Sequence, residues 1–456
     1  MQLVIEIPNN FVPERKYAID CLLRYFDGVS WSFKEVNKNQ TQFMYQDKSF
    51  LVIQDAFWQN LDENDFDYKK IAVPETPVLV DLESPLFEGN ITSIYGTDAF
   101  VFKDGCLSLQ ADIIASTFFL LTRWEEYALP NRDAFNRFPD EAAFLFKNKL
   151  TDRPLVNEYI AFLKIVLRTV SGNEIQYNRK YCAHITHDID EIYRFSPISK
   201  FFKALGGDLI IRKSLKQFFQ TIAQKIRISQ DKEKDPSDTF EYLMDISEKE
   251  QLRSSFYFIP GEKGEKDFRY SISDSTVQKI IQSIHERGHI VGIHPSLETN
   301  GNAESFATEV KRLTKTSRQA PKTGRHHYLA FQVPSTWRFW EDNKLTMDSS
   351  IGYRTCAGFR AGMCYAYPVF DILQRKELTV QELPLTFMEV ALTNNKVAPD
   401  AFEQIAEDLA NTVKKFQGDF VLLWHNNNIY HPFYAAYGDR YERIIKKVSG
   451  QKQGAV

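Results

Sequence analysis

The sequence predicts an α/β protein made of two parts. Residues 1–175 combine short strand-like runs with two helices, whereas strands and helices alternate from Tyr181 onward. Such alternation is typical of parallel βα units, whose functional residues collect where the strands end. With 456 residues available, we expect a smaller α/β N-terminal domain over residues 1–175 and a parallel domain over residues 176–456.

In the N-terminal part, strand-like runs occur at residues 3–7, 49–53 and 77–80. A nearly apolar helix is expected over residues 110–127 and an amphipathic helix over residues 155–170. The first helix carries polar side chains for which either a buried network or solvated and capping roles could be expected; we favour the latter for Asp112, Arg123, Glu125 and Glu126.

In the C-terminal part, strands are expected at residues 182–186, 254–259, 289–293, 382–386 and 420–424, with 321–328 and 356–360 as further segments of the same pattern. Helices are expected at 239–251, 275–287 and 401–416. Asp274 or Ser273 should cap the second of these helices, and Gly288 should end it. The basic, polar residues 212–238 indicate a solvated excursion on the surface.

The composition excludes several classes of protein. The net charge of −4 gives no basic field for nucleic acid. The start of the chain lacks the pattern of a signal peptide, and no window approaches about 18 uninterrupted apolar residues, so no membrane span is expected. Five scattered cysteines favour a reducing compartment, and we therefore expect a cytoplasmic location.

The strongest functional signal is a set of acids and histidines at strand ends. Asp188 and Asp190 are two residues apart, so on a strand they face the same side. His294 and His425 each follow another apolar strand. Carboxylates and imidazoles bind zinc-type cations, and a further carboxylate can act as a base. We therefore expect one site at which these side chains meet.

Each of these residues also has an ordinary structural interpretation. A strand-end aspartate can be a turn former, a single histidine can be a satisfied core residue, and Arg325 could be a surface arginine. Two acids on one face after Thr186 and His187 are harder to explain in that way. His289 begins its strand at the opposite end from His294 and is expected to be structural.

Taken in order, the motifs over residues 180–430 resemble the NodB-homology polysaccharide deacetylases, the carbohydrate esterase family 4 type. The segment Thr186-His187-Asp188-Ile189-Asp190 is similar to the first motif of that family. Residues 288–294 are similar to the second motif, Arg325-His326-His327-Tyr328 occupies the place of the third, and Leu423-Trp424-His425 is similar to the last.

The resemblance implies a distorted parallel (β/α) barrel of about seven strands and a role for each matching residue. Asp188 would be the catalytic base, Arg325 would orient it, and His425 would be the general acid. Asp190 and His294 would bind a divalent metal, with zinc the expected ion.

This chain departs from the family pattern at the second histidine of the metal site. The position four residues after His294 is Glu298, and a glutamate can bind zinc, so Glu298 is our first expectation for the remaining ligand. His326 or His327 could supply a nitrogen instead, or the metal could be weakly bound or absent. The proline pair of the third motif is also replaced.

The expected function is that of a bacterial hydrolase acting on carbon–nitrogen bonds other than peptide bonds. It would remove N-acetyl groups, with O-acetyl groups as the second choice, from a saccharide of a cell-surface polysaccharide or its precursor. The alternative is a degenerate deacetylase-like domain that binds glycans without cutting them. The N-terminal domain could also dock the protein onto proteins of polysaccharide synthesis.

Overall fold

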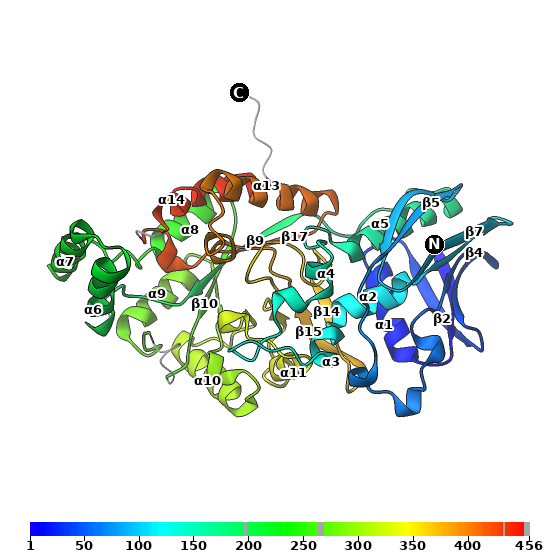
Figure 1. Ribbon diagram of the computed structural model, residues 1–456, viewed down its shortest axis with the longest axis horizontal. Coiled ribbons are helices and arrows are strands. Elements are labelled where there is room, and N and C mark those ends of the chain that lie inside the picture. The colour runs from blue at the N-terminus through cyan, green and yellow to red at the C-terminus, as the bar shows by residue number, and fades with distance from the viewer. Residues whose placement is uncertain (196–197, 231, 263–268, 432–433, 451–456) are drawn as a thin grey trace, which may run out of the picture.

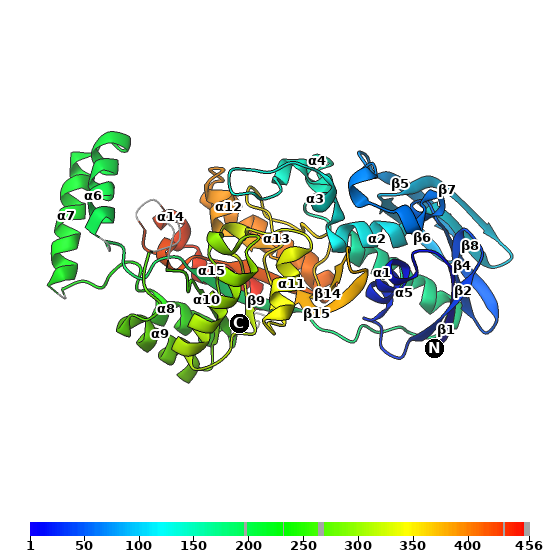
Figure 2. The ribbon, with the colours of Figure 1, turned by 90° about the horizontal axis from the view of Figure 1, so that it is seen from below.

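The computed structural model describes residues 1–195, 198–230, 232–262, 269–431 and 434–450 (Figure 1). Two large sheets lie side by side along the molecule and share no strand. The N-terminal sheet is at one end, and a helical hairpin projects at the other (Figure 2). The α/β class expected from the sequence is confirmed.

The N-terminal sheet has the strand order β2-β1-β3-β4-β8-β7, with a separate β5-β6 ribbon. Its strands are β1 (Gln2–Pro8), β2 (Ser30–Val36), β3 (Gln40–Tyr45), β4 (Lys48–Gln54), β5 (Val78–Ser84), β6 (Phe87–Ser93), β7 (Gly96–Lys103) and β8 (Cys106–Ala111). Its helices are α1 (Val12–Leu23), α2 (Ile113–Thr122), α3 (Trp124–Ala128), α4 (Phe144–Lys147) and α5 (Leu155–Ser171).

The single helix expected over residues 110–127 is wrong in one respect, because the chain breaks at Arg123. This residue adopts a left-handed conformation, with φ of 53°, between α2 and α3. Its buried guanidinium donates to Glu125 and Glu126, at 2.7 and 3.0 Å, and to the carbonyl of Arg360. A buried network therefore forms here, and only Asp112 has the expected capping role, accepting from the amide of Ala115.

The C-terminal sheet has nine strands in the order β14-β15-β13-β12-β11-β10-β9-β17-β16. They are β9 (Cys182–Ile189), β10 (Ser254–Phe258), β11 (Ile290–Ile293), β12 (Thr323–Gly324), β13 (Met347–Asp348), β14 (Tyr367–Asp371), β15 (Lys376–Glu382), β16 (Phe387–Met388) and β17 (Asp419–Leu423). All neighbours pair in parallel except β14 with β15. The expected number of about seven strands is too low, and residues 356–360 form no strand.

Most helices of this part lie around the sheet, whereas the first two project from it (Figures 1 and 2). They are α6 (Ile198–Gly206), α7 (Leu215–Ser229), α8 (Phe240–Lys249), α9 (Ser275–Glu286), α10 (Ala303–Ser317), α11 (Ser335–Asp342), α12 (Glu389–Thr393), α13 (Pro399–Lys415), α14 (Ala435–Gly438) and α15 (Tyr441–Val448). Asp274 caps α9 as expected, accepting from the amide of Thr276 at 2.8 Å. The alternation of strands and helices thus gives the parallel arrangement that the sequence predicts.

Strand register brings the carboxyl ends of the central strands to one edge. Phe258 of β10 is opposite both Ile189 of β9 and Ile293 of β11, and Ile293 is opposite Gly324 of β12. The β11–β12 approach is so close that a Cβ on Gly324 would lie 1.9 Å from the carbonyl oxygen of Ile293. Residues that directly follow these strands must therefore gather at the same edge.

One continuous apolar core joins the two sheets. The ring of Tyr17, on α1, lies 4.9 Å from the ring of Phe370, on β14. Its hydroxyl donates to the carbonyl of Pro368 at 2.8 Å. Phe118 of α2 packs edge-on against Phe370 as well. Buried aromatic side chains thus pack the N-terminal part of the chain against the parallel sheet.

Candidate metal and catalytic site

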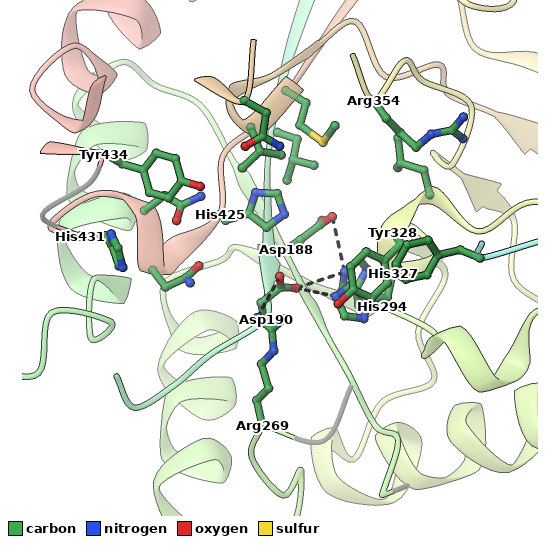
Figure 3. Close-up of a pocket in the computed structure, with 18 of the residues that line it drawn as sticks. Asp188, Asp190, Arg269, His294, His327, Tyr328, Arg354, His425, His431 and Tyr434 are labelled. Carbon is green, nitrogen blue, oxygen red and sulfur yellow. Dashed lines mark hydrogen bonds and ion pairs between the residues drawn. The ribbon is translucent and has the colours of Figure 1, made fainter. Parts of the chain in front are cut away.

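The side chains predicted from the strand ends line one cavity of about 670 Å³. Asp188 lies near the end of β9 and Asp190 directly follows that strand, so both face the cavity, whereas His187 and Ile189 are buried on the other side. His294 follows β11, and His425 follows β17. Figure 3 shows these four side chains converging. The predicted spatial meeting of Asp188, Asp190, His294 and His425 is present.

Three side chains form a group suited to a divalent cation. Oδ1 of Asp190 lies 3.5 Å from Nε2 of His294 and 3.4 Å from Nε2 of His327 (Figure 3). All three ligand atoms lie within 4.8 Å of one another. Tetrahedral zinc with bonds of about 2.0–2.1 Å holds neighbouring ligand atoms about 3.3–3.5 Å apart. The spacing and the two-histidine, one-carboxylate donor set therefore fit such an ion.

Two further observations support a metal at this group. Oδ1 of Asp190 and Nε2 of His294 are buried, yet neither has a hydrogen-bond partner among the described residues, which is costly unless a ligand satisfies them. Nδ1 of His294 is bonded to the carbonyl oxygen of Arg325. That bond places the proton on Nδ1 and leaves the lone pair of Nε2 available for a metal.

The charge state of Asp190 also suits a metal ligand. Burial alone would raise the pKa of Asp190, but His327 and His294 hold that pKa well below its usual range. Arg269 contributes from the other side, with Nη1 3.4 Å from Oδ2 of Asp190. Asp190 is therefore ionised at neutral pH.

The structure does not bring Glu298 to this group, so our first expectation for the remaining ligand is corrected. Pro295 disfavours helical backbone at His294, and Glu298 lies in a short 3-10 turn with its side chain exposed. It lines a separate hollow together with Glu262 and Arg312. His327, one of the two alternatives, occupies the position instead.

The neighbouring histidine, His326, points away from the site. Its ring is buried and stacks on Phe306, with centroids 5.5 Å apart. Burial and the nearby His294 lower the pKa of His326 to about 3, so its ring stays neutral. Of the two adjacent histidines, His327 lines the site, where it begins a 3-10 turn.

Arg325 is hydrogen-bonded to Asp188. Nη1 of this fully buried arginine lies 2.9 Å from Oδ1 of Asp188 and 2.9 Å from Oγ1 of Thr186. Nε and Nη2 donate to the carbonyl and hydroxyl oxygens of Ser349, at 2.8 and 2.9 Å. Oδ2 of Asp188 remains 3.6 Å from Nε2 of His294. The free oxygen of Asp188 thus lies directly beside the metal-binding group.

His425 is held by a carboxylate that the sequence reasoning missed. Nδ1 of His425 lies 2.6 Å from Oε1 of Glu389, at the start of α12. Burial alone would lower the pKa of His425, but Glu389 raises it to about 9, with smaller contributions from Asp190 and Asp188. His425 is therefore protonated at neutral pH, with Nε2 left to face the cavity.

Other residues of the cavity also went unpredicted. Tyr328 stacks on His327, with ring centroids 3.9 Å apart, and Arg269 reaches Asp190 from the segment before α9 (Figure 3). Neither follows an apolar strand, which was the signal used to find the others. The position of Glu389 directly after the apolar pair Phe387-Met388 was the one sequence signal for it.

A comparison with protein families matches the N-terminal part of the chain. Residues 3–172 match a family described as a family of unknown function, DUF7033. None of the curated proteins compared matches the chain. No helix among the described residues is long and apolar enough to cross a bilayer.

Solved structures similar to the chain include a candidate polysaccharide deacetylase from Mycobacterium smegmatis. It is 14% identical, covers 60% of this chain and 86% of its own, and has a TM-score of 0.39. A polysaccharide deacetylase from Bacillus cereus is also 14% identical, with coverages of 59% and 88% and a TM-score of 0.30. A variant of a CE4-family pseudoenzyme is 9% identical, with coverages of 59% and 63% and a TM-score of 0.31.

These likenesses have TM-scores of 0.30 to 0.39 and identities of 9 to 14%, and one of them is to a pseudoenzyme. Function has to be inferred from the side chains of the site.

Proposed function

We propose that this protein is a metal-dependent hydrolase that removes N-acetyl groups from sugar units of a bacterial polysaccharide or its precursor. One observation carries the proposal. A base carboxylate, Asp188, and a protonated imidazole, His425, line the same cavity as a two-histidine, one-carboxylate group. Hydrolysis of an amide needs both a base for water and an acid for the departing amine.

Asp190, His294 and His327 would hold the cation, which when bound supplies Lewis acidity for the acetyl carbonyl and its attacking water. Asp188 takes the proton of that water, since its Oδ2 lies beside the group while Oδ1 is held by Arg325. His425 gives its Nε2 proton to the sugar nitrogen as the carbon–nitrogen bond breaks. Glu389 keeps His425 charged and correctly turned.

The glycan-binding alternative was motivated by an incomplete ligand set at Glu298. His327 supplies the ligand that Glu298 does not, and this favours the enzyme over the binding module. Zinc remains the proposed metal, because nitrogen and carboxylate donors in this number and spacing suit it.

Acetate release from a panel of acetylated saccharides, with and without a chelator, tests the proposal. We expect release that the chelator stops and added Zn²⁺ restores. Asp188→Asn should abolish release while the metal stays bound, and Glu298→Ala should leave release unchanged. A protein that binds metal and saccharide but never releases acetate would be a binding module instead.

A further inference from the structure

Helices α6 and α7 form a hairpin that stands away from the rest of the molecule (Figure 2). A π-helical turn, η5 (Gly207–Ile211), joins them. No residue of α6 is buried, and Thr221 is the buried residue of α7. The sequence predicted only a solvated, basic excursion for part of this segment.

The hairpin has its polar side turned inward. Gln217, Gln220, Thr221 and Gln224 of α7 line a hollow of about 490 Å³ shared with Arg194. Asp208 of η5 accepts from the hydroxyl of Thr221 at 2.7 Å and pairs with Arg212. Asp208 thus ties the connecting turn to α7 through polar contacts.

The apolar side is turned outward. Leu215, Phe219 and Ile226 are exposed along one stripe of α7, and half-buried Ile222 completes the spacing of i, i+4, i+7 and i+11. At the connecting turn, Ile210 and Ile211 are 76% and 82% exposed. Eight of the fourteen most exposed large apolar side chains in the described chain lie between Ile198 and Ile226. A patch of this kind marks an interaction surface.

The charge of the hairpin narrows the choice of partner. Residues 198–229 contain seven lysines and arginines but one acidic residue, Asp208, in a chain whose net charge is −4. Lys203, Lys213 and Lys216 are exposed and make no ion pair within the described residues. Apolar side chains flanked by cations match a bilayer surface with anionic headgroups, which attract lysine and arginine while the acyl boundary takes up the apolar side chains.

We propose that the α6–α7 hairpin docks the protein onto an anionic lipid bilayer by shallow insertion of its exposed apolar side chains. This is binding to the surface of the bilayer, and no helix needs to span it. Arg212, at the base of the turn, also lines the cavity of the candidate site. Docking would therefore hold that cavity close to the lipid surface, whatever reaction takes place there.

Vesicle sedimentation of the full-length protein tests this docking independently of turnover. We expect binding to mixed phosphatidylglycerol–phosphatidylcholine vesicles, weaker binding at high salt, and little binding to pure phosphatidylcholine. The double variant Ile210→Ser, Ile211→Ser should bind at least about tenfold more weakly. Lys213→Gln with Lys216→Gln should weaken binding to the anionic vesicles selectively.

The matched control is Leu79→Ser with Val101→Ser, since both side chains are 60% exposed on the N-terminal strands. Its vesicle binding should equal that of the unaltered protein. Circular dichroism should show that every variant is folded.

Absence of binding to anionic vesicles, or equal loss in the control, would overturn the proposal. So would light scattering that shows a dimer which Ile210→Ser, Ile211→Ser dissociates, because the patch would then be covered by a second copy.

Discussion

Nδ1 of His425 lies 2.6 Å from Oε1 of the buried Glu389, and His425 lines the cavity that Asp188 shares. Nδ2 of Asn428 donates to the same Glu389 oxygen at 2.8 Å. The carboxylate is thereby fixed in direction as well as charge. The imidazolium is thus the form of His425 that the surrounding side chains stabilise.

The pH dependence of turnover should reveal this pair. Because the general acid must be protonated, activity that depends on His425 should persist below its pKa of about 9 and fall as pH rises through that value. In Glu389→Gln the anion is gone, so the falling limb should move toward about pH 6.5 or lower, and turnover at neutral pH should drop about tenfold or more. The rate of acetate release measured across pH checks this expectation.

Glu298→Gln serves as the control for that shift, because it removes a carboxylate outside the site. Its pH profile should match that of the unaltered protein. An unchanged falling limb in Glu389→Gln would remove His425 from the role of general acid.

Metal content should distinguish His327 from Glu298. His327→Ala or His294→Ala should lower the stoichiometry of bound zinc well below one per chain, because each removes one of three ligands. Glu298→Ala should retain it. Elemental analysis of each purified variant after dialysis gives the measurement, and zinc loss on Glu298→Ala alone would restore our original expectation.

Replacing Arg325 should affect turnover more than substrate binding. Arg325→Lys keeps a positive charge but loses the fork that reaches Asp188, Thr186 and Ser349 at once. We expect kcat to fall roughly 10–100-fold with KM little changed. Arg325→Met should also lower the free energy of unfolding by about 3–5 kcal/mol, since it leaves a buried carboxylate unpaired.

Arg354→Lys is a suitable comparison, because Arg354 lines the same cavity and pairs with Asp140 at 2.9 Å instead. Steady-state kinetics and chemical denaturation of the variants supply both readouts. Equal kcat in Arg325→Lys and the unaltered protein would show that Asp188 needs no such positioning.

A buried pair of acids behind Arg325 should make stability depend on pH. Asp348 and Glu382 are opposite each other on β13 and β15, and both are fully buried. Burial raises the pKa of Asp348 to about 7 and that of Glu382 well above its usual range. The folded chain therefore keeps protons that the unfolded chain releases near pH 4, and stability should decrease as pH rises from about 4 to about 7.

Glu382→Gln should flatten this decrease, because the amide stays uncharged at every pH. It should cost some stability at every pH, since the amide of Ile351 and the indole of Trp337 donate to different oxygens of Glu382 and a glutamine has only one acceptor oxygen. Denaturant unfolding at several pH values provides the comparison. A stability that rises with pH over the same window would contradict the protonated state of the pair.

The convergence of the strand-end residues could be predicted from the sequence, because it follows from the regular geometry of strands and of parallel sheets. Period-two alternation places Asp188 and Asp190 on one face, and parallel pairing aligns the ends of β9, β11 and β17. Neither rule depends on distant packing. The same reasoning correctly left His289 at the opposite end of its strand, where its Nδ1 accepts from the amide of Ser254.

The remaining ligand could not be assigned in this way, because it depends on irregular backbone. Glu298 was chosen because it occupies the place of the second histidine in the family pattern, four residues after His294, and the chain makes a 3-10 turn there that leaves Glu298 exposed. His327 reaches the site just before Tyr328, whose φ is +59°. A bulky residue seldom adopts that conformation without support from tertiary contacts. The backbone conformation at Tyr328 therefore could not be predicted from local sequence preference.

The break at Arg123 has a similar cause. Its neighbours favour one long helix, whereas its guanidinium binds the carbonyl of Arg360, 237 residues away. Long-range polar contacts of this kind override local preference and have no sequence period.

The aromatic contact between Tyr17 and Phe370 bears on how the protein can be dissected. A fragment ending near residue 175 would lack part of the apolar core that the two sheets share. Tyr17 and Phe118 would lose the ring of Phe370 that packs on them. Such a fragment would expose an apolar surface that is buried in the intact chain. A pull-down with it would capture proteins that bind this surface nonspecifically. Assays for a docking role of the N-terminal region are better made with the intact chain and substitutions on its outer strands.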